Sequence, residues 1–120
     1  MNESPLFSRT HDLLLWLIPQ AQKFPRAHRF GLGERVQDAA LDFQELLIAA
    51  GKTRDVEWRG LLRQADVRLA QLKHWARVCL ELKLFSVGQY EHAARMMEEC
   101  GRLLGAWLKQ SAMLKSNETE

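Results

Sequence analysis

The chain has 120 residues, of which 47% are hydrophobic and 27% are charged, and its formal net charge is +2. This length fits one domain and excludes two, and the composition is that of a globular protein rather than a disordered one. The chain has only two cysteines, which excludes a disulfide scaffold.

No segment resembles a membrane span or a secretory signal. The longest unbroken apolar run is Leu13 to Ile18, whereas a membrane-spanning helix needs roughly twenty apolar residues. The first residues contain no basic stretch that leads into an apolar one. We therefore expect a protein of the reducing cytoplasm, with no membrane association.

The first predicted helix begins at Ser4-Pro5, where a serine cap precedes a proline in the first turn. Ser8 and Thr10 are alternative starts. The helix runs to about Phe24, but Pro19 lies inside it. Because proline removes a backbone donor, we expect it to kink the helix or to end it just before that position.

The second predicted helix begins at about Arg29 or Glu34 and ends at Ala50. Its apolar residues recur three and four positions apart, which is the period of a helix. Gly51 follows directly, so we expect it to form a glycine cap at the C-terminus of the helix.

The third and fourth predicted helices span Val56–Phe85 and Gln89 to about Leu114. Both contain apolar residues at alternating spacings of three and four, and only a few residues separate the two segments. That pattern is typical of an antiparallel helical pair. We therefore predict an all-α, antiparallel up-down four-helix bundle in a single domain of residues 1–115, followed by a flexible polar tail at 116–120.

Two segments carry more apolar surface than one small bundle can cover: Leu13–Ile18 and Trp75–Phe85. The sequence therefore favours a homo-oligomer, in which neighbouring subunits cover the excess. The alternative is a kink or crossing angle that buries these residues within one subunit. Two glycines in the fourth helix either allow close helix packing or are simply tolerated. The candidate packing and oligomer residues are Trp16, Leu80, Leu84, Gly101, Gly105 and Trp107.

No catalytic or metal-binding pattern stands out. The histidines and cysteines lack the short spacings of a zinc site. Asp38 and Asp42 share a helix face, but a di-iron bundle also needs Glu-x-x-His motifs, so a solvated acidic face is the better interpretation. Cys79 and Cys100 occupy apolar positions and should be small buried residues, too far apart for a disulfide. We expect no enzyme activity, cofactor or metal.

The charges are unevenly distributed along the chain. Residues 20–35 carry a net charge of +3 and residues 51–80 one of +4, whereas residues 36–50 carry −3. A nearly neutral chain with two basic segments is expected to have a localised positive surface.

The predicted topology brings these cations together. If the second and third helices pair around Thr53, the first connection lies level with Lys73 and Arg77, at one end of the bundle. Such a cluster fits the phosphates of a nucleic acid. An acidic protein surface would fit equally, and a merely solvated basic end is the third possibility. The candidate residues are Arg26, His28, Arg29 and Arg35 from the connection, with Arg63, Lys73 and Arg77, and His74 beside them.

Four motifs, in this order, resemble the accessory variability determinant proteins of diversity-generating retroelements, which are related to the four-helix proteins encoded in ribosomal RNA intervening sequences. The similarity covers about residues 10–110. The motifs lie at Phe24–His28, Leu47–Lys52, Ala65–Arg77 and Gly101–Trp107.

The resemblance implies a four-helix bundle assembled as a ring-like homopentamer in a bacterial, phage or archaeal host. It implies a non-enzymatic partner that binds the element's reverse transcriptase and its template RNA, or an RNA/DNA hybrid, and supports mutagenic cDNA synthesis. The matching basic positions are Arg26, Lys73, Arg77 and Arg102. The alternative is an RNA-binding or structural protein of the intervening-sequence type, with no polymerase partner.

Overall fold

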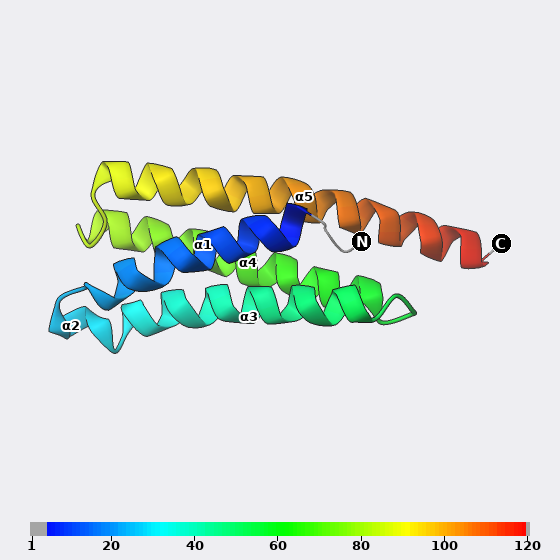
Figure 1. Cartoon of the computed structure of the whole chain (residues 1–120), viewed down its shortest axis with the longest axis horizontal. Coiled ribbons are helices and arrows are strands. Elements are labelled where there is room, and N and C mark those ends of the chain that lie inside the picture. Colours follow the sequence, from blue (N-terminus) through cyan, green and yellow to red (C-terminus); the bar gives the residue numbers. More distant parts are fainter. Residues whose placement is uncertain (1–4, 120) are drawn as a thin grey trace.

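Helices account for most of the computed structural model, which describes residues 5–119 and the side chains of residues 5–113. The helices of this part of the chain are α1 (Pro5–Gln22), α2 (Arg26–Arg29), α3 (Leu32–Lys52), α4 (Trp58–Glu81) and α5 (Val87–Thr119). α2 is a single turn. The other four pack as an antiparallel bundle with extents of 54 × 23 × 23 Å (Figure 1). The predicted all-α, up-down four-helix bundle is confirmed.

The core follows the predicted spacing of three and four. On α4, every residue of the predicted apolar seam is at most 2% exposed. These residues are Leu62, Ala65, Leu69, Leu72, Ala76 and Cys79. On α5 the buried apolar residues are Ala93, Met97, Cys100 and Leu104. Full burial of a leucine side chain stabilises a fold by about 1.5–3 kcal/mol, so these stripes hold the four helices together.

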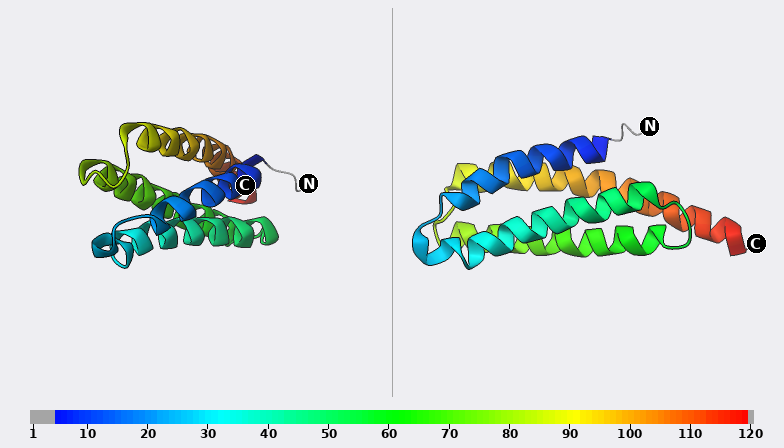
Figure 2. Two further views of the ribbon diagram at one scale, coloured as in Figure 1. Left: turned by 60° about the vertical axis from the view of Figure 1, so that its left-hand side comes forward. Right: turned by 60° about the horizontal axis from the view of Figure 1, so that its bottom comes forward.

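Each long helix packs against the two that flank it in the bundle. α3 and α4 share the most extensive contact, α4 packs on α5, and α1 closes the bundle against α3 and α5. Figure 2 shows this square arrangement from two further sides. α5 has 33 residues and is the longest of the described helices. At a rise of about 1.5 Å per residue, it spans about 50 Å. Its C-terminal part extends beyond the rest of the bundle (Figure 1).

The first helix continues through its proline. α1 ends at Gln22, so the predicted end before Pro19 is wrong. Pro19 is exposed, whereas Leu17 and Ala21 on either side of it are buried in the core. Packing of these neighbours maintains the helix despite the missing backbone donor. The predicted serine cap, Ser4, lies outside the described residues.

The glycine predicted to cap the second helix lies inside it. α3 runs to Lys52 and its cap is Thr53, and no described glycine has a positive φ. A Cβ on Gly51 would lie 2.8 Å from Cζ of Phe7. The glycine therefore makes room for the Phe7 ring of α1 rather than for a left-handed turn, and the predicted cap is wrong.

A left-handed residue ends α4, four residues earlier than predicted. Lys83 has a φ of 63°. Its N–H donates to the carbonyl oxygen of Leu80 at 3.0 Å, and the N–H of Leu84 donates to that of Cys79 at 2.8 Å. These two bonds form a Schellman motif, which satisfies carbonyl groups at the end of a helix.

α5 begins three residues after Leu84, two residues earlier than predicted. The N–H of Gln89 donates to Oγ of Ser86 at 3.1 Å, and the N–H of Ser86 donates to Oε1 of Gln89 at 2.8 Å. This reciprocal pair is a capping box. At its other end α5 extends to Thr119. It includes the first four residues of the predicted tail, and because Glu120 lies outside the described residues, the flexibility of 116–120 stays a prediction.

Aromatic contacts join the two connections at one end of the bundle. Phe24 precedes α2 and Phe85 lies in the α4–α5 turn, and both are 2% exposed. Their ring centroids are 5.5 Å apart in an edge-to-face arrangement, and Trp16 of α1 lies 6.1 Å from Phe85. Such pairs contribute about 0.5–1.5 kcal/mol beyond their burial. The contact fixes the α1–α2 connection against the α4–α5 turn.

A second aromatic cluster closes the opposite end. Trp107 of α5 contacts Phe7 of α1 at 5.5 Å and Trp58 of α4 at 6.4 Å between centroids. The guanidinium of Arg54 lies 4.4 Å from the Trp58 ring and 5.6 Å from the Trp107 ring. These cation–π contacts hold the α3–α4 connection against α5.

The left-handed conformation of Lys83 predicts a stabilising substitution. An L-residue in this region costs about 1–2 kcal/mol, and glycine largely avoids that cost. We expect Lys83→Gly to raise the free energy of unfolding by about 1 kcal/mol and Lys83→Val to lower it, as measured by urea denaturation. A glycine variant less stable than the wild type would contradict the assigned turn.

Candidate partner-binding interface

The short helix α2 is fixed rigidly to the end of the bundle. The backbone N–H groups of His28 and Arg29 both donate to the carbonyl oxygen of Pro25, at 2.8 and 3.0 Å. Nε of Arg29 donates to the carbonyl oxygen of Phe24 at 3.3 Å. On the other side, a Cβ on Gly33 would lie 3.3 Å from the carbonyl oxygen of His28. α2 is therefore close-packed between the end of α1 and the start of α3.

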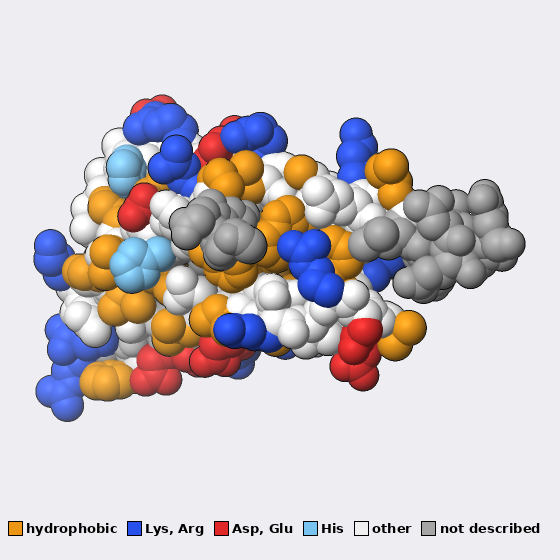
Figure 3. All heavy atoms as spheres, turned by 45° about the vertical axis from the view of Figure 1, so that its right-hand side comes forward, with side chains coloured by type: hydrophobic (Ala, Val, Ile, Leu, Met, Phe, Trp, Pro, Cys, Tyr) orange, Lys and Arg blue, Asp and Glu red, His pale blue; other side chains and the backbone are white. Residues whose placement is uncertain are grey.

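This end carries the predicted cations of the first connection. Arg26 and Arg29 are exposed on α2, and Arg35 is exposed in the first turn of α3. None of the three belongs to an ion pair among residues 5–113. Figure 3 shows basic side chains at this end, at the left, as well as along the upper edge, with acidic ones along the lower edge. The α2 end therefore carries three exposed arginines that take part in no ion pair with a described residue.

Arg77 approaches the same end from α4, as predicted. Nε of Arg68 lies 3.7 Å from Oδ2 of Asp42, and the antiparallel register that this pair sets places Arg77 opposite Gly33, at the start of α3. Arg77 is not free, however, because its Nε donates to Oε2 of Glu81 at 2.8 Å. Its charge is partly neutralised within its own helix.

Arg63 and Arg102 lie away from this end. Arg63 is 14 residues before Arg77 on α4, which is about 21 Å along the helix. Arg102 donates from Nη2 to Oε2 of Glu99 at 2.7 Å and from Nε to Oε1 at 3.1 Å. These bonds hold the pKa of Glu99 below its usual value and raise that of Arg102. Arg9 adds a longer contact with Glu99, at 3.9 Å.

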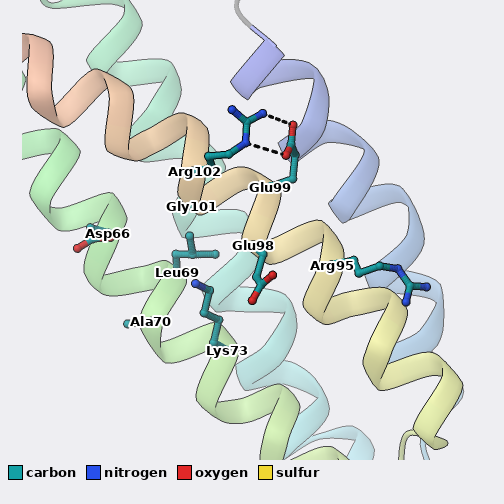
Figure 4. Close-up of a pocket in the computed structure, with 9 residues that line it drawn as sticks. All are labelled: Asp66, Leu69, Ala70, Lys73, Arg95, Glu98, Glu99, Gly101 and Arg102. Atoms are coloured by element: carbon teal, nitrogen blue, oxygen red, sulfur yellow. Dashed lines mark hydrogen bonds and ion pairs between the residues drawn. The ribbon is translucent and has the colours of Figure 1, made fainter.

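Lys73 lies in a groove between α4 and α5. The groove has a volume of about 590 Å³ and a floor that includes Leu69 and Gly101. Nζ of Lys73 is 3.5 Å from the position of a Cβ on Gly101, so these two residues of α4 and α5 lie at the same level of the bundle. Figure 4 shows Lys73 and Glu98 over the groove from opposite helices, whereas Arg95 points toward α1. The lining mixes both signs of charge, unlike the α2 end.

The predicted oligomer residues are engaged within the chain to different degrees. Trp16 and Leu84 are partly buried against the core, as is Trp107 in its aromatic cluster. Leu80 is half-buried. Gly101 meets α4, but a Cβ on Gly105 would have no neighbour within 4 Å. A Cβ on Gly101 would make only ordinary van der Waals contacts, at 3.5 Å, so close packing within a single chain requires neither glycine.

Three residues at the α2 end were not singled out from the sequence. Lys23 and Lys83 are exposed cations of the two connections at this end. Phe30, the C-terminal cap of α2, is 68% exposed. The sequence does contain a signal for Phe30, because an aromatic residue directly follows Arg29. Interleaved aromatic and basic residues are typical of nucleic-acid-binding surfaces.

Both cysteines are buried and free, and a disulfide is absent as predicted from the register. Sγ of Cys100 lies 3.7 Å from Oγ1 of Thr10, whose hydroxyl donates to the carbonyl oxygen of Leu6 at 2.8 Å. Burial raises the pKa of Cys100, and it raises that of Cys79 from 9.0 to about 12. Among the described residues, acidic, histidine and cysteine side chains form no group that could hold a metal ion, and no helix is long and apolar enough to span a bilayer.

The buried thiol of Cys79 predicts a pH dependence. Below pH 9 the thiol is protonated in both states, so it adds no slope. Between about pH 9 and 12 only the unfolded chain releases the proton, so the free energy of unfolding should fall as the pH rises through this window. In denaturant titrations Cys79→Ala should lose part of this slope. Parallel pH profiles for the two proteins would contradict the prediction.

Comparison with known proteins identifies a family. The model of the family described as bAvd-like matches residues 6–111. The match runs from α1 through most of α5 and includes both the α2 end and the α4–α5 groove. No curated protein matches the chain.

Proposed function

The chain belongs to the bAvd-like family, the bacterial accessory variability determinants of diversity-generating retroelements, and from this premise we propose that it binds the element's reverse transcriptase and template RNA through the α2 end of the bundle. In this role it supports mutagenic cDNA synthesis without catalysing a step itself. The observation that carries the proposal is the gathering of Arg26, Arg29 and Arg35 at this end, with no ion pair among the described side chains.

Unpaired cations on a rigid support favour contacts with phosphates. Each arginine that contacts a phosphate releases condensed counterions from the nucleic acid, which gives affinity that depends on salt rather than on sequence. A cation already paired with a carboxylate must first give up that partner. Arg77 and Arg102 are paired in this way, so the α2 cations should contribute most of the binding.

A charge-reversal pair tests the interface. Arg26→Glu with Arg29→Glu should abolish association with the cognate reverse transcriptase and template RNA, as measured by co-purification and by gel shift at physiological salt. The matched control is Lys52→Glu with Lys109→Glu, which makes the same change in net charge near the opposite end of the bundle and should leave association intact.

Circular dichroism should show the same helicity in both pairs. Unchanged association of the α2 variant would overturn the interface. If the wild-type chain binds RNA but does not bind the reverse transcriptase, the result would favour a protein of the intervening-sequence type instead.

We also propose that the chain assembles as a ring-like homo-oligomer, with five subunits by analogy with the family resemblance. Exposed apolar residues on the outer faces of the helices support an oligomer, because large apolar patches are uncommon on monomers. Leu41 and Ile48 are seven residues apart on α3 and are 40% and 49% exposed. They lie two turns apart on one face of the helix.

The mass in solution tests the assembly. Light scattering coupled to size exclusion should give a mass of about five times the 13.9 kDa of one chain. Ile48→Glu should lower that mass, because it would bury a charge between subunits. A stable mass near 13.9 kDa for the wild type would overturn the proposal.

A further inference from the structure

Phe30 is the most unusual residue of the α2 end. Its side chain is 68% exposed, although a phenylalanine gains about 1.5–3 kcal/mol from full burial. The backbone at this position is ordinary, with a φ of −96° and a ψ of 5°. The exposed ring is therefore not explained by the packing or the geometry of the chain itself.

Phe30 directly follows Arg29, whose Nε donates to the carbonyl oxygen of Phe24, and it lies one helical turn after the exposed Arg26. Arg29 and Phe30 follow Arg26 by three and four residues across one helical turn, and residues at these spacings are neighbours on a helix surface. Glu34 is the only acidic residue between positions 20 and 35. An exposed ring near exposed cations has both parts of a nucleotide-binding surface: a stacking face for a base and cations for phosphates.

We propose that this surface binds an unpaired RNA strand, with one base stacked on the ring of Phe30 and the adjoining phosphates held by Arg26 and Arg29. The inference rests on the proposed function and names the part of the RNA that the α2 end binds. Bases in a duplex are already stacked on each other, whereas bases in loops and single strands can stack on an aromatic side chain.

The surroundings of Phe30 favour RNA over a protein surface. Aromatic residues at the centre of protein interfaces are surrounded by contacts that exclude water from them. The residues of α2 that precede Phe30 include Arg26 and Arg29, which are charged and exposed. Exposed guanidinium groups on the same turn as an exposed ring combine the cations and the stacking face of a surface that binds single-stranded nucleic acid.

Fluorescence anisotropy with labelled RNA tests the proposal on the full chain. The probes are a single-stranded oligonucleotide and a duplex that contains the same strand, both at physiological salt. We expect Phe30→Ala to weaken binding of the single strand by about 5- to 100-fold and to leave duplex binding nearly unchanged. Phe30→Trp should retain the affinity and show quenching of its indole fluorescence when the strand binds.

Val56→Ala and Val56→Trp are the matched controls. Val56 is 84% exposed on the α3–α4 connection at the opposite end, so its substitution tests the loss of an exposed apolar side chain away from the site. Neither control should change affinity, and the Val56→Trp signal should be unaffected by RNA. Circular dichroism should confirm that all four variants fold.

Three outcomes would overturn the inference. The first is an unchanged affinity of Phe30→Ala for the single strand, and the second is an equal loss for the duplex. The third is a loss of reverse transcriptase association with RNA binding intact, which would make Phe30 a protein-docking residue. Failure of the wild-type chain to bind both RNA and the reverse transcriptase would instead overturn the proposed function as well.

Discussion

The contact between Phe24 and Phe85 determines how the candidate interface is built. Each ring is buried, and the two lie 5.5 Å apart between the α1–α2 connection and the α4–α5 turn. These segments are 61 residues apart in the chain and have no regular backbone pairing with each other. Because the rings join them, the cations of both connections share one rigid end rather than moving separately on two loops.

Pairing within the helices then determines which cations remain available. Arg77 and Arg102 are bonded to carboxylates three or four residues away, and Lys73 faces a groove of mixed charge. Pairs of this kind contribute little to stability at an exposed surface, but they reduce the positive potential that a partner meets. Arg26, Arg29 and Arg35, on α2 and at the start of α3, take part in no such pair with a described residue.

The sequence was sufficient for the long-range architecture, because apolar spacing dictates which faces are buried. The apolar stripe from Leu62 to Cys79 predicted the core face of α4, and the short break before the next segment predicted that α4 and α5 pair. Helix ends were less predictable. The role of Gly51 depends on the ring of Phe7, 44 positions away, which no local pattern contains. At the end of α4, Lys83 adopts a conformation that favours glycine.

The candidate site was predicted in outline and not in detail. The arginines around His28 were identified from local charge and helix pairing, which are visible in a single sequence. Whether these arginines are free to bind a partner could not be predicted, because it depends on which side chains reach each other across a helical turn. The ion pair of Arg77 with Glu81 and the exposure of Phe30 are both features of the folded chain that its local sequence does not specify. Composition counts charges, whereas binding depends on those left without a partner.

The two ends of the bundle differ in character, and this gives each subunit a direction. The exposed Arg26, Arg29 and Arg35 lie at one end of a body 54 Å long, and the aromatic cluster of Trp58 and Trp107 lies at the other. Cyclic symmetry repeats the same end of every subunit on the same side of a ring. Although the net charge is only +2 per chain, the proposed assembly would place the same arginines of every subunit on one side of the ring. An RNA that reaches several of them gains avidity by about 10²- to 10⁴-fold without any new kind of contact.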